Sequence, residues 1–535
     1  MNDATEGVSP PTAKAEPVRR QRAVVVAALA TGIVLAAAAL RIYDLGGKDV
    51  WLDEANGVVM SQGSLGELFT RLRLDASPPL YYIMLHVWIS VFGDSEIALR
   101  SLSVLVGLGV VGCLFVVGRR LLSLETGALA AVLAATLPIH IFYSQKIRMY
   151  TLLGLVALLS AYWLWRAIRD DKPAFVVAYG LTTLAALYVH NCALYLLPAH
   201  GVILLWSGGL RRRPITWLIC GGCIVAGYLP WLPTFLAQLE FQMDSSWRMR
   251  LWQRQGVTGA LARTLASFTP GPPYALFRFA SPPRVQVPSL LLFSLTGLLG
   301  GVRALRGARG AVRPKARAPW LVSFACVPVA SALAASVLIT PNYIPGRTDQ
   351  LVFPGFVLLV ALGLTVVRPL LLRYGLLAVF LLYSALGLHH YYGNQWARSD
   401  REIARAIATR ARPGDAVLCT SLTRASLQYY LGRAKTPVTL FSYPRDSALH
   451  LGSQDDTALL KDPGTLRREI YLVEQQIKEE CGPRSRFFLV LADVRVNKLL
   501  HDVLVRSGRT TTLEVIGDFK QAGTGIDVAL LLQRF

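Results

Sequence analysis

The sequence predicts a polytopic helical membrane protein that carries a compact α/β domain at its carboxyl end. Of its 535 residues, 53% are hydrophobic and 16% are charged, and its apolar runs recur at roughly the 20 residues that a helix needs to cross a bilayer. The formal net charge of +22 lies in short basic clusters between these runs, a distribution that does not favour nucleic-acid binding. From about residue 395, short strand and helix patterns replace the long apolar runs.

The basic clusters orient the predicted spans, because short loops rich in Lys and Arg stay on the cytoplasmic side. The apolar run over residues 80–92 is too short to cross the bilayer. We therefore predict interfacial helices over about 54–66 and 79–92, and with that choice every later basic cluster lies inside. The eleven predicted spans are 23–40, 96–118, 124–141, 149–165, 174–190, 192–208, 215–235, 287–302, 320–340, 350–367 and 374–388.

This topology predicts three parts in a multi-pass protein of the cell (plasma) membrane: a cytoplasmic tail (1–22), a transmembrane domain (23–388) and an extracytoplasmic α/β domain (389–535). The polar loop 236–286 also lies outside. The α/β domain lacks a GxGxxG or Walker loop, so a nucleotide site is not expected. Its expected strands are 415–419, 437–442, 487–492, 511–519 and 527–533, and its expected helices are 425–431, 465–480 and 495–507.

Two adjacent carboxylates, Asp53 and Glu54, stand directly behind Trp51 on the predicted outer face. A tryptophan ring suits the headgroup region, which places the acids at the membrane surface. A carboxylate there can deprotonate a hydroxyl held within hydrogen-bond distance. The alternative is that the acids stabilise the first turn of the next helix.

Further motifs follow these acids in a characteristic order and spacing. The segments are Trp51–Glu54, Asp75–Tyr82, Phe92–Arg100 and Tyr143–Tyr150. Together they resemble the GT-C membrane glycosyltransferases of the dolichyl-phosphate-mannose protein mannosyltransferase and lipid A aminoarabinose transferase type. The resemblance extends over about residues 23–200, with a weaker match in 320–365 around Asn342–Arg347 and Pro354.

The resemblance implies a GT-C fold and an inverting sugar transfer on the extracytoplasmic side. The donor would be a polyprenyl-phosphate-linked sugar, and the acceptor a hydroxyl of a cell-envelope glycan, lipid or protein. In this family the first acid of the pair is the catalytic base, which here is Asp53, with Glu54 beside it. No cofactor is expected. No metal is assigned either, since His389 and His390 lack acid or Cys partners at ligand spacing.

Cationic and aromatic side chains on the outer face are the expected substrate-binding groups. Arginine suits a phosphate because its planar fork donates two hydrogen bonds. Interface snorkelling can also explain Arg148, a structural contact can explain Arg347, and a helix-end hydrogen bond can explain His190. The expected substrate-binding residues are Tyr81, Lys146, Arg148, Tyr150, His190 and Arg347.

Two departures from the family pattern leave a second function open. Relatives often carry Glu where this chain has Lys146, and a basic residue near the position of Ser77. The alternative is therefore a non-catalytic GT-C relative that binds or moves a lipid-linked glycan. A secondary transporter would require paired repeats with broken helices, which the sequence does not show.

Three other features have competing explanations. The basic aromatic segment 247–254 fits amphipathic surface binding as well as substrate recognition. Cys220 and Cys223 have redox-motif spacing but lie in an apolar run, so packing is expected. Cys419 and Cys481 fall in the external domain, where a disulfide is permitted.

Overall fold

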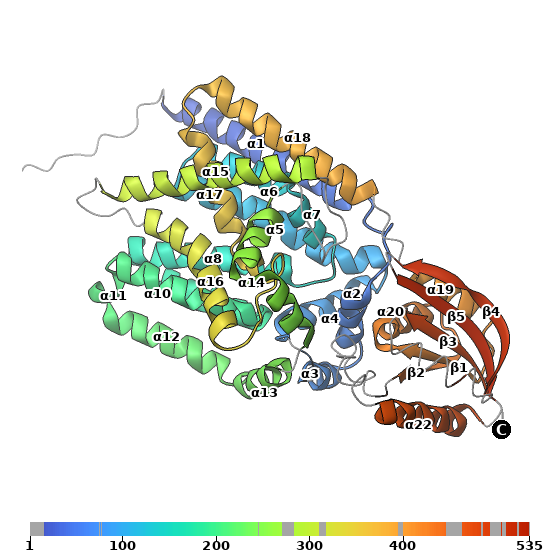
Figure 1. Ribbon diagram of the computed structural model, residues 1–535. Coiled ribbons are helices and arrows are strands. Elements are labelled where there is room, and N and C mark those ends of the chain that lie inside the picture. The colour runs from blue at the N-terminus through green and yellow to red at the C-terminus, as the bar shows by residue number, and fades with distance from the viewer. Residues whose placement is uncertain are drawn as a thin grey trace, which may run out of the picture.

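The computed structural model shows a helical bundle joined to a small α/β domain (Figure 1). It describes residues 15–73, 75, 77–243, 246–269, 283–309, 317–393, 400–443, 445, 463–482, 485–492, 504, 510–521 and 524–533.

Six helices are long and apolar enough to cross a membrane, which makes the chain a multi-pass membrane protein. They are α1 (Ala15–Ile42), α5 (Glu96–Leu121), α8 (Tyr150–Asp170), α15 (Pro283–Arg309), α16 (Arg317–Leu338) and α18 (Leu370–Gly393). Two bent pairs can each count as one further span. The first joins α6 (Leu124–Thr136) to α7 (Pro138–Ser144) at 64°, and the second joins α12 (Pro214–Tyr228) to α13 (Leu232–Met243) at 69°.

The remaining three predicted spans are shorter helices. They are α9 (Pro173–Val189), the 3-10 turn η1 (Asn191–Tyr195) continued by α10 (Leu196–Trp206), and α17 (Phe353–Val366). Length and composition thus support six to eight spans in the described part of the chain, and not eleven. Every predicted span does coincide with an apolar helix or bent pair. The difference arises because these three helices, at 17 residues or fewer, are shorter than the roughly 20 residues that a straight span needs.

The interfacial region contains three short helices rather than two. They are α2 (Leu52–Ser61), α3 (Leu65–Arg73) and α4 (Leu80–Phe92). α4 forms where it is predicted, and Gly93 ends it with a φ of 78°. The helix expected over 54–66 is broken instead, because Gly63 takes a φ of 85° that other residues rarely adopt.

The segment expected to be a polar loop over 236–286 is largely helical where the structure describes it. The second half of the bent pair, α13, is followed by α14 (Ser246–Ser267), which is kinked at Gly256 with a φ of 56°. Earlier in the chain, a single turn, α11 (Gly209–Arg212), precedes α12. The sequence signal was weak because α14 mixes basic and apolar side chains around all its faces.

The carboxyl-terminal domain has a five-stranded sheet in the order β2-β1-β3-β5-β4. β1 pairs in parallel with β2 and β3, and β5 runs antiparallel to β3 and β4, so the sheet is mixed. Its elements are α19 (Asp400–Ala408), β1 (Asp415–Thr420), α20 (Ser421–Arg433), β2 (Val438–Tyr443), α22 (Pro463–Cys481), β3 (Arg486–Ala492), β4 (Thr510–Gln521) and β5 (Thr524–Gln533). The expected strands and helices are found, except that the helix 495–507 lies outside the described residues and α19 was not expected.

Side chains that alternate along β1 point to opposite faces of the sheet. Val417 and Cys419 belong to a hydrophobic core that continues from the membrane helices, whereas Ala416 and Leu418 pack in a separate core with α22. Cys481 packs against that second core, and both Cys419 and Cys481 are free thiols. Cys220 and Cys223 are also free thiols. Cys220 is buried, as expected for packing, whereas Cys223 is exposed.

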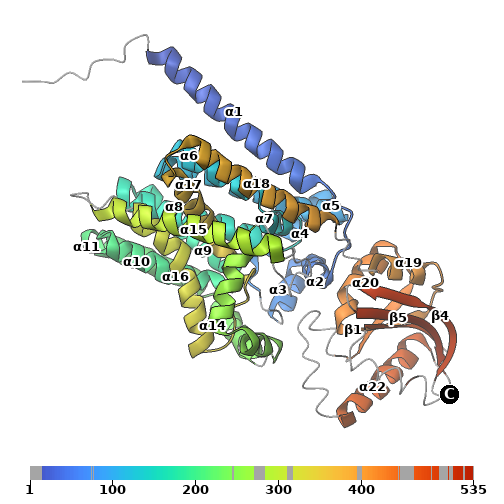
Figure 2. The ribbon, with the colours of Figure 1, turned by 45° about the horizontal axis from the view of Figure 1, so that its top comes forward.

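The α/β domain lies against the interfacial helices. In both ribbon views α20 faces α2 across the junction (Figures 1 and 2). The shared core joins the two parts, since Val50 and Tyr430 are buried members of the same hydrophobic cluster. The domain is therefore packed directly onto the element that carries Asp53 and Glu54.

Candidate active site

Asp53 is the second residue of α2, and two arginines from distant segments meet it. Its Oδ2 lies 3.1 Å from Nη2 of Arg347, and its backbone carbonyl accepts a hydrogen bond of 3.2 Å from Nη1 of Arg148. The Asp53 side chain is 21% exposed, so solvent or a substrate can reach the carboxylate. Asp53 thus combines an accessible oxygen with a flanking positive charge.

Glu54, the neighbouring acid, is fully buried and surrounded by donors. Its carboxylate forms ion pairs with Arg100 at 3.4 Å and with Nζ of Lys146 at 3.2 Å, and it accepts a hydrogen bond of 3.0 Å from the Ile147 amide. Burial alone would raise the pKa of Glu54, but these two charges and the amide outweigh it and lower the pKa to about 2. Glu54 also accepts a long bond from the Trp51 amide, so the helix-start explanation applies to this acid.

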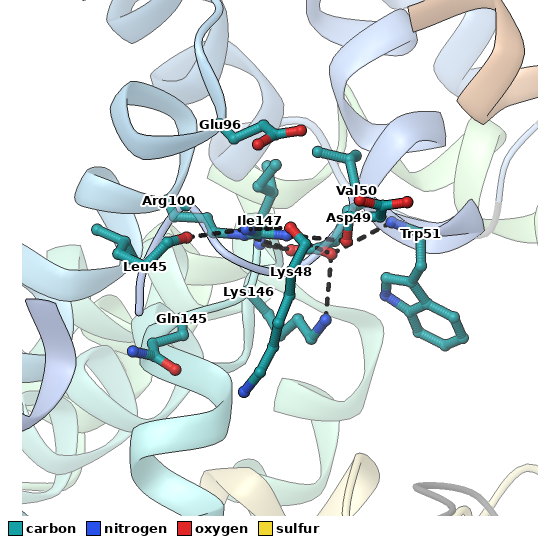
Figure 3. Close-up of polar contacts among 12 residues, drawn as sticks. Leu45, Lys48, Asp49, Val50, Trp51, Glu96, Arg100, Gln145, Lys146 and Ile147 are labelled. Atoms are coloured by element: carbon teal, nitrogen blue, oxygen red, sulfur yellow. Dashed lines mark hydrogen bonds and ion pairs between the residues drawn. The ribbon is translucent and has the colours of Figure 1, made fainter. Parts of the chain in front are cut away.

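Arg100 connects the buried carboxylate to residues 43–51, here called the pre-helix segment. Its guanidinium donates to the carbonyls of Leu45 and Lys48 at 2.8 Å each, and to that of Asp49 at 3.0 Å. Figure 3 shows the Arg100 side chain reaching these carbonyls while Lys146 approaches the same group of polar atoms. Arg100 therefore holds the polypeptide just before Asp53 in place by binding its backbone carbonyls.

A cavity of about 300 Å³ opens beside Arg347. Tyr150, His190, Arg248 and Arg347 line its polar side, and apolar side chains such as Phe235 complete the wall. Among the described lining residues there is no carboxylate, so the charge in the wall is positive. Because Arg347 also contacts Asp53, the cavity adjoins the accessible acid.

The structure brings five of the predicted site residues together: Asp53, Arg148, Tyr150, His190 and Arg347. The guanidinium of Arg148 stacks 5.6 Å from the centre of the Tyr150 ring, and the His190 ring lies 5.9 Å from the same ring. His190 also accepts a hydrogen bond from the Cys192 amide at 3.0 Å, so its helix-end role is present as well.

Three predicted substrate-binding residues, Tyr81, Lys146 and Arg148, do not line the cavity. Arg148 instead contacts the Asp53 carbonyl and the Tyr150 ring. Tyr81 is 2% exposed and packs edge-to-face on Tyr82 within the core. Lys146 pairs with Glu54 and lies near the rings of Trp51 and Phe142. Ser77, for which no phosphate contact was expected, does line the cavity.

Two residues outside the predicted site matter to the geometry. Arg248 belongs to the basic aromatic segment, for which substrate recognition was one of two explanations, and it lines the cavity. Asp349 was not singled out from the sequence. It is buried, and its Oδ2 accepts a hydrogen bond of 2.9 Å from the Gly346 amide, next to Arg347. Nothing in the local sequence around Asp349 indicates this role.

No group of three or more His, Cys, Asp or Glu side chains in the described residues could hold a metal ion. The arrangement can instead bind an anion at Arg347 and Arg248 and accept a proton at Asp53. These are the two tasks that a displacement of a phosphate by a hydroxyl requires.

Comparisons with known proteins agree on the fold. Residues 76–233 match the sequence profile of the family described as dolichyl-phosphate-mannose-protein mannosyltransferase. No curated protein matches this sequence. The structure resembles ArnT from Cupriavidus metallidurans bound to undecaprenyl phosphate, with a TM-score of 0.56, 14% identity, and coverage of 93% of this chain and 97% of that one.

Two further solved structures have the same architecture. The apo state of the same ArnT gives a TM-score of 0.58 at 12% identity, covering 96% of this chain and 98% of that one. The archaeal oligosaccharyltransferase AglB from Archaeoglobus fulgidus, in complex with an inhibitory peptide and a dolichol-phosphate, gives 0.52 at 11% identity, covering 86% and 69%. The chain is therefore a multi-span membrane protein of the GT-C fold, and its residues 76–233 are similar to the dolichyl-phosphate-mannose-protein mannosyltransferase family.

Proposed function

We propose that the chain transfers a sugar from a polyprenyl-phosphate-linked donor to a hydroxyl acceptor of the cell envelope, on the extracytoplasmic face and with inversion at the sugar. The observation that carries this proposal is the position of Arg347, which contacts Asp53 and also lines the cationic cavity. The two relatives whose structures hold undecaprenyl phosphate and dolichol-phosphate support a lipid phosphate as the carrier.

In this reaction Asp53 accepts the proton of the acceptor hydroxyl while the acceptor oxygen bonds to the anomeric carbon. The bond from that carbon to the carrier phosphate breaks at the same time, and the phosphate leaves with the electron pair. Arg347 and Arg248 stabilise the charge that develops on the phosphate. The apolar part of the cavity wall excludes water, which strengthens both interactions.

The ion pair between Asp53 and Arg347 suggests an order of binding. A carrier phosphate in the cavity competes with the Asp53 carboxylate for the Arg347 fork. When the phosphate takes that fork, the carboxylate is left free to accept a proton. The donor therefore binds before the acceptor is activated.

The buried position of Lys146 weakens the non-catalytic alternative. That alternative was based on Lys146, a cation where relatives often carry an acid, and on Ser77, which does line the cavity. Lys146 lies against Glu54 instead, at 3.2 Å, and takes no part in the cavity wall. Its charge is used to balance a buried carboxylate.

The proposal is tested by measuring sugar transfer by the purified full-length protein in lipid. Defined polyprenyl-phosphate donors with labelled sugars are supplied with a crude envelope acceptor. We expect labelled product to accumulate with at least one donor, together with release of the carrier phosphate. Binding of carrier lipid without turnover of any donor would favour the non-catalytic relative.

A further inference from the structure

The pre-helix segment is held from two opposite sides, and only one of them belongs to the membrane domain. Arg100 of α5 binds its carbonyls from one side. On the other side the Val50 amide donates a hydrogen bond of 2.8 Å to the hydroxyl of Tyr430, which lies in α20 of the carboxyl-terminal domain. That contact joins residues 380 positions apart in the sequence.

Tyr430 is itself fixed at this junction. Its hydroxyl donates a hydrogen bond of 2.6 Å to Oε1 of Glu96, at the start of α5. Tyr430 is 8% exposed and Val50 is fully buried, so the bond between them forms away from water, whereas the bond from Tyr430 to Glu96 is part-buried. Loss of a buried partner leaves the remaining polar group unsatisfied, which makes such bonds costly to break.

Arg401, in α19 of the same domain, adds a second contact to the segment. Its guanidinium Nε lies 3.2 Å from Oδ1 of Asp49, and its backbone amide donates to Oδ2 of Asp49 at 3.1 Å. Its Nη2 lies 2.5 Å from Oε2 of Glu96. Arg401 therefore bridges the residue before Val50 and the carboxylate that receives Tyr430.

These contacts lie only a few residues from the proposed base. Asp49 and Val50 immediately precede Trp51, which caps α2, and Asp53 is the second residue of that helix. We propose that Tyr430 and Arg401 are positioning residues for the reaction, and that the carboxyl-terminal domain is part of the active-site scaffold. This inference rests on the proposed function, because it concerns the placement of its catalytic carboxylate.

A neighbouring anchor provides an internal comparison. The hydroxyl of Tyr429 donates to the Asp94 carbonyl at 2.9 Å, and Arg433 lies 3.4 Å from the Asp94 carboxylate. These contacts hold the loop before α5 and do not reach the pre-helix segment. The Tyr429→Phe variant therefore shows how far weaker docking of the domain, without any change at the pre-helix segment, affects exchange and turnover.

The test compares three Tyr→Phe variants of the full-length protein in lipid: Tyr430→Phe, Tyr429→Phe and Tyr471→Phe. Tyr471 is 51% exposed on α22 and serves as the surface control. Amide hydrogen exchange is measured for the peptide covering residues 48–56. We expect clearly faster exchange in Tyr430→Phe and unchanged exchange in the other two.

Transfer kinetics provide the second readout. Misplacing a catalytic group by about 1 Å can lower turnover by roughly ten- to a hundredfold, so kcat should fall by about tenfold or more in Tyr430→Phe. The donor KM should stay within about twofold, because the cavity residues are untouched. Arg401→Gln should also speed exchange and lower kcat. Arg401→Lys keeps the positive charge, so its exchange rate and its kcat should lie between those of the native protein and Arg401→Gln.

Three outcomes are decisive. Faster exchange together with lower kcat supports the inference. Unchanged exchange at 48–56, or a lower melting temperature with kcat per folded molecule unchanged, overturns it. If the native protein transfers no sugar, the proposed function fails, while the exchange data still decide whether Tyr430 holds the segment.

Discussion

At the residue scale, the two adjacent acids lie in different environments because consecutive side chains on a helix point in different directions. Successive side chains on an α-helix point about 100° apart, since the helix has roughly 3.6 residues per turn. Asp53 consequently faces Arg347 and the cavity, and Glu54 faces the buried Arg100 and Lys146. The sequence predicted the pair and its location, but the division of environments depends on residues 100, 146 and 347, which only the fold brings together.

Glu54→Gln should destabilise the protein strongly, because it leaves two buried cations without their shared carboxylate. Removing one partner of a buried ion pair costs about 3–5 kcal/mol, and the change should appear as a large fall in melting temperature. Glu479→Gln, at an exposed site on α22, should leave the melting temperature unchanged. Equal melting temperatures for the two variants would contradict the proposed role of Glu54.

The lowered pKa of Glu54 predicts that the stability of the protein depends on pH. Its folded-state pKa of about 2 lies below the ordinary value for Glu. The stability that it contributes is therefore complete above about pH 4.5 and is lost as the pH falls toward 2. Thermal unfolding followed across this acid range should show the loss in the native protein and a weaker loss in Glu54→Gln.

At the element scale, the sequence predicted correctly those helices whose first and last residues are determined by the local sequence. α4 begins after Pro79 and ends at Gly93, and an uninterrupted apolar run lies between them. The break between α2 and α3 was not predictable, because one Gly in a polar stretch does not specify its φ. α13 and α14 were missed because their helical form depends on tertiary contacts, such as the bond from Gln238 to the Leu72 carbonyl.

Asp349 lies in the loop that carries Arg347, and Asp349→Asn should make the stability of the folded protein less dependent on pH. Burial raises the pKa of Asp349 to about 7. Since this value lies above the ordinary one, the folded protein binds the proton more tightly than the unfolded chain. The resulting stability is complete below about pH 4 and is lost as the pH rises through about 7.

The measurement is the melting temperature in lipid between about pH 4 and pH 8, with the loss expected between about pH 4 and pH 7. The native protein should lose stability across this range, and Asp349→Asn should lose less. Asp171→Asn, an exposed site at the end of α8, should behave like the native protein. A native melting temperature that is constant over the range would contradict the explanation.

At the scale of the whole molecule, the candidate site joins parts that the sequence could only treat separately. The motifs around Asp53 and Arg148 and the weaker motif at Arg347 were each recognisable, and the predicted face placed them on one side of the membrane. Their meeting at one residue, Asp53, requires α2, the segment before α8 and the loop before α17 to pack together. The junction with the carboxyl-terminal domain had no sequence signal, because neither Tyr430 nor Arg401 belongs to a recognisable motif.

The central claim is that Asp53 accepts the acceptor proton in a sugar transfer. The most direct measurement is transfer of labelled sugar from a polyprenyl-phosphate donor by Asp53→Asn, with carrier binding measured in the same samples and Asp171→Asn as the matched control. We expect Asp53→Asn to bind the carrier lipid and lose at least about a hundredfold in kcat, with Asp171→Asn unchanged. Turnover close to the native rate in a folded Asp53→Asn protein would contradict the account.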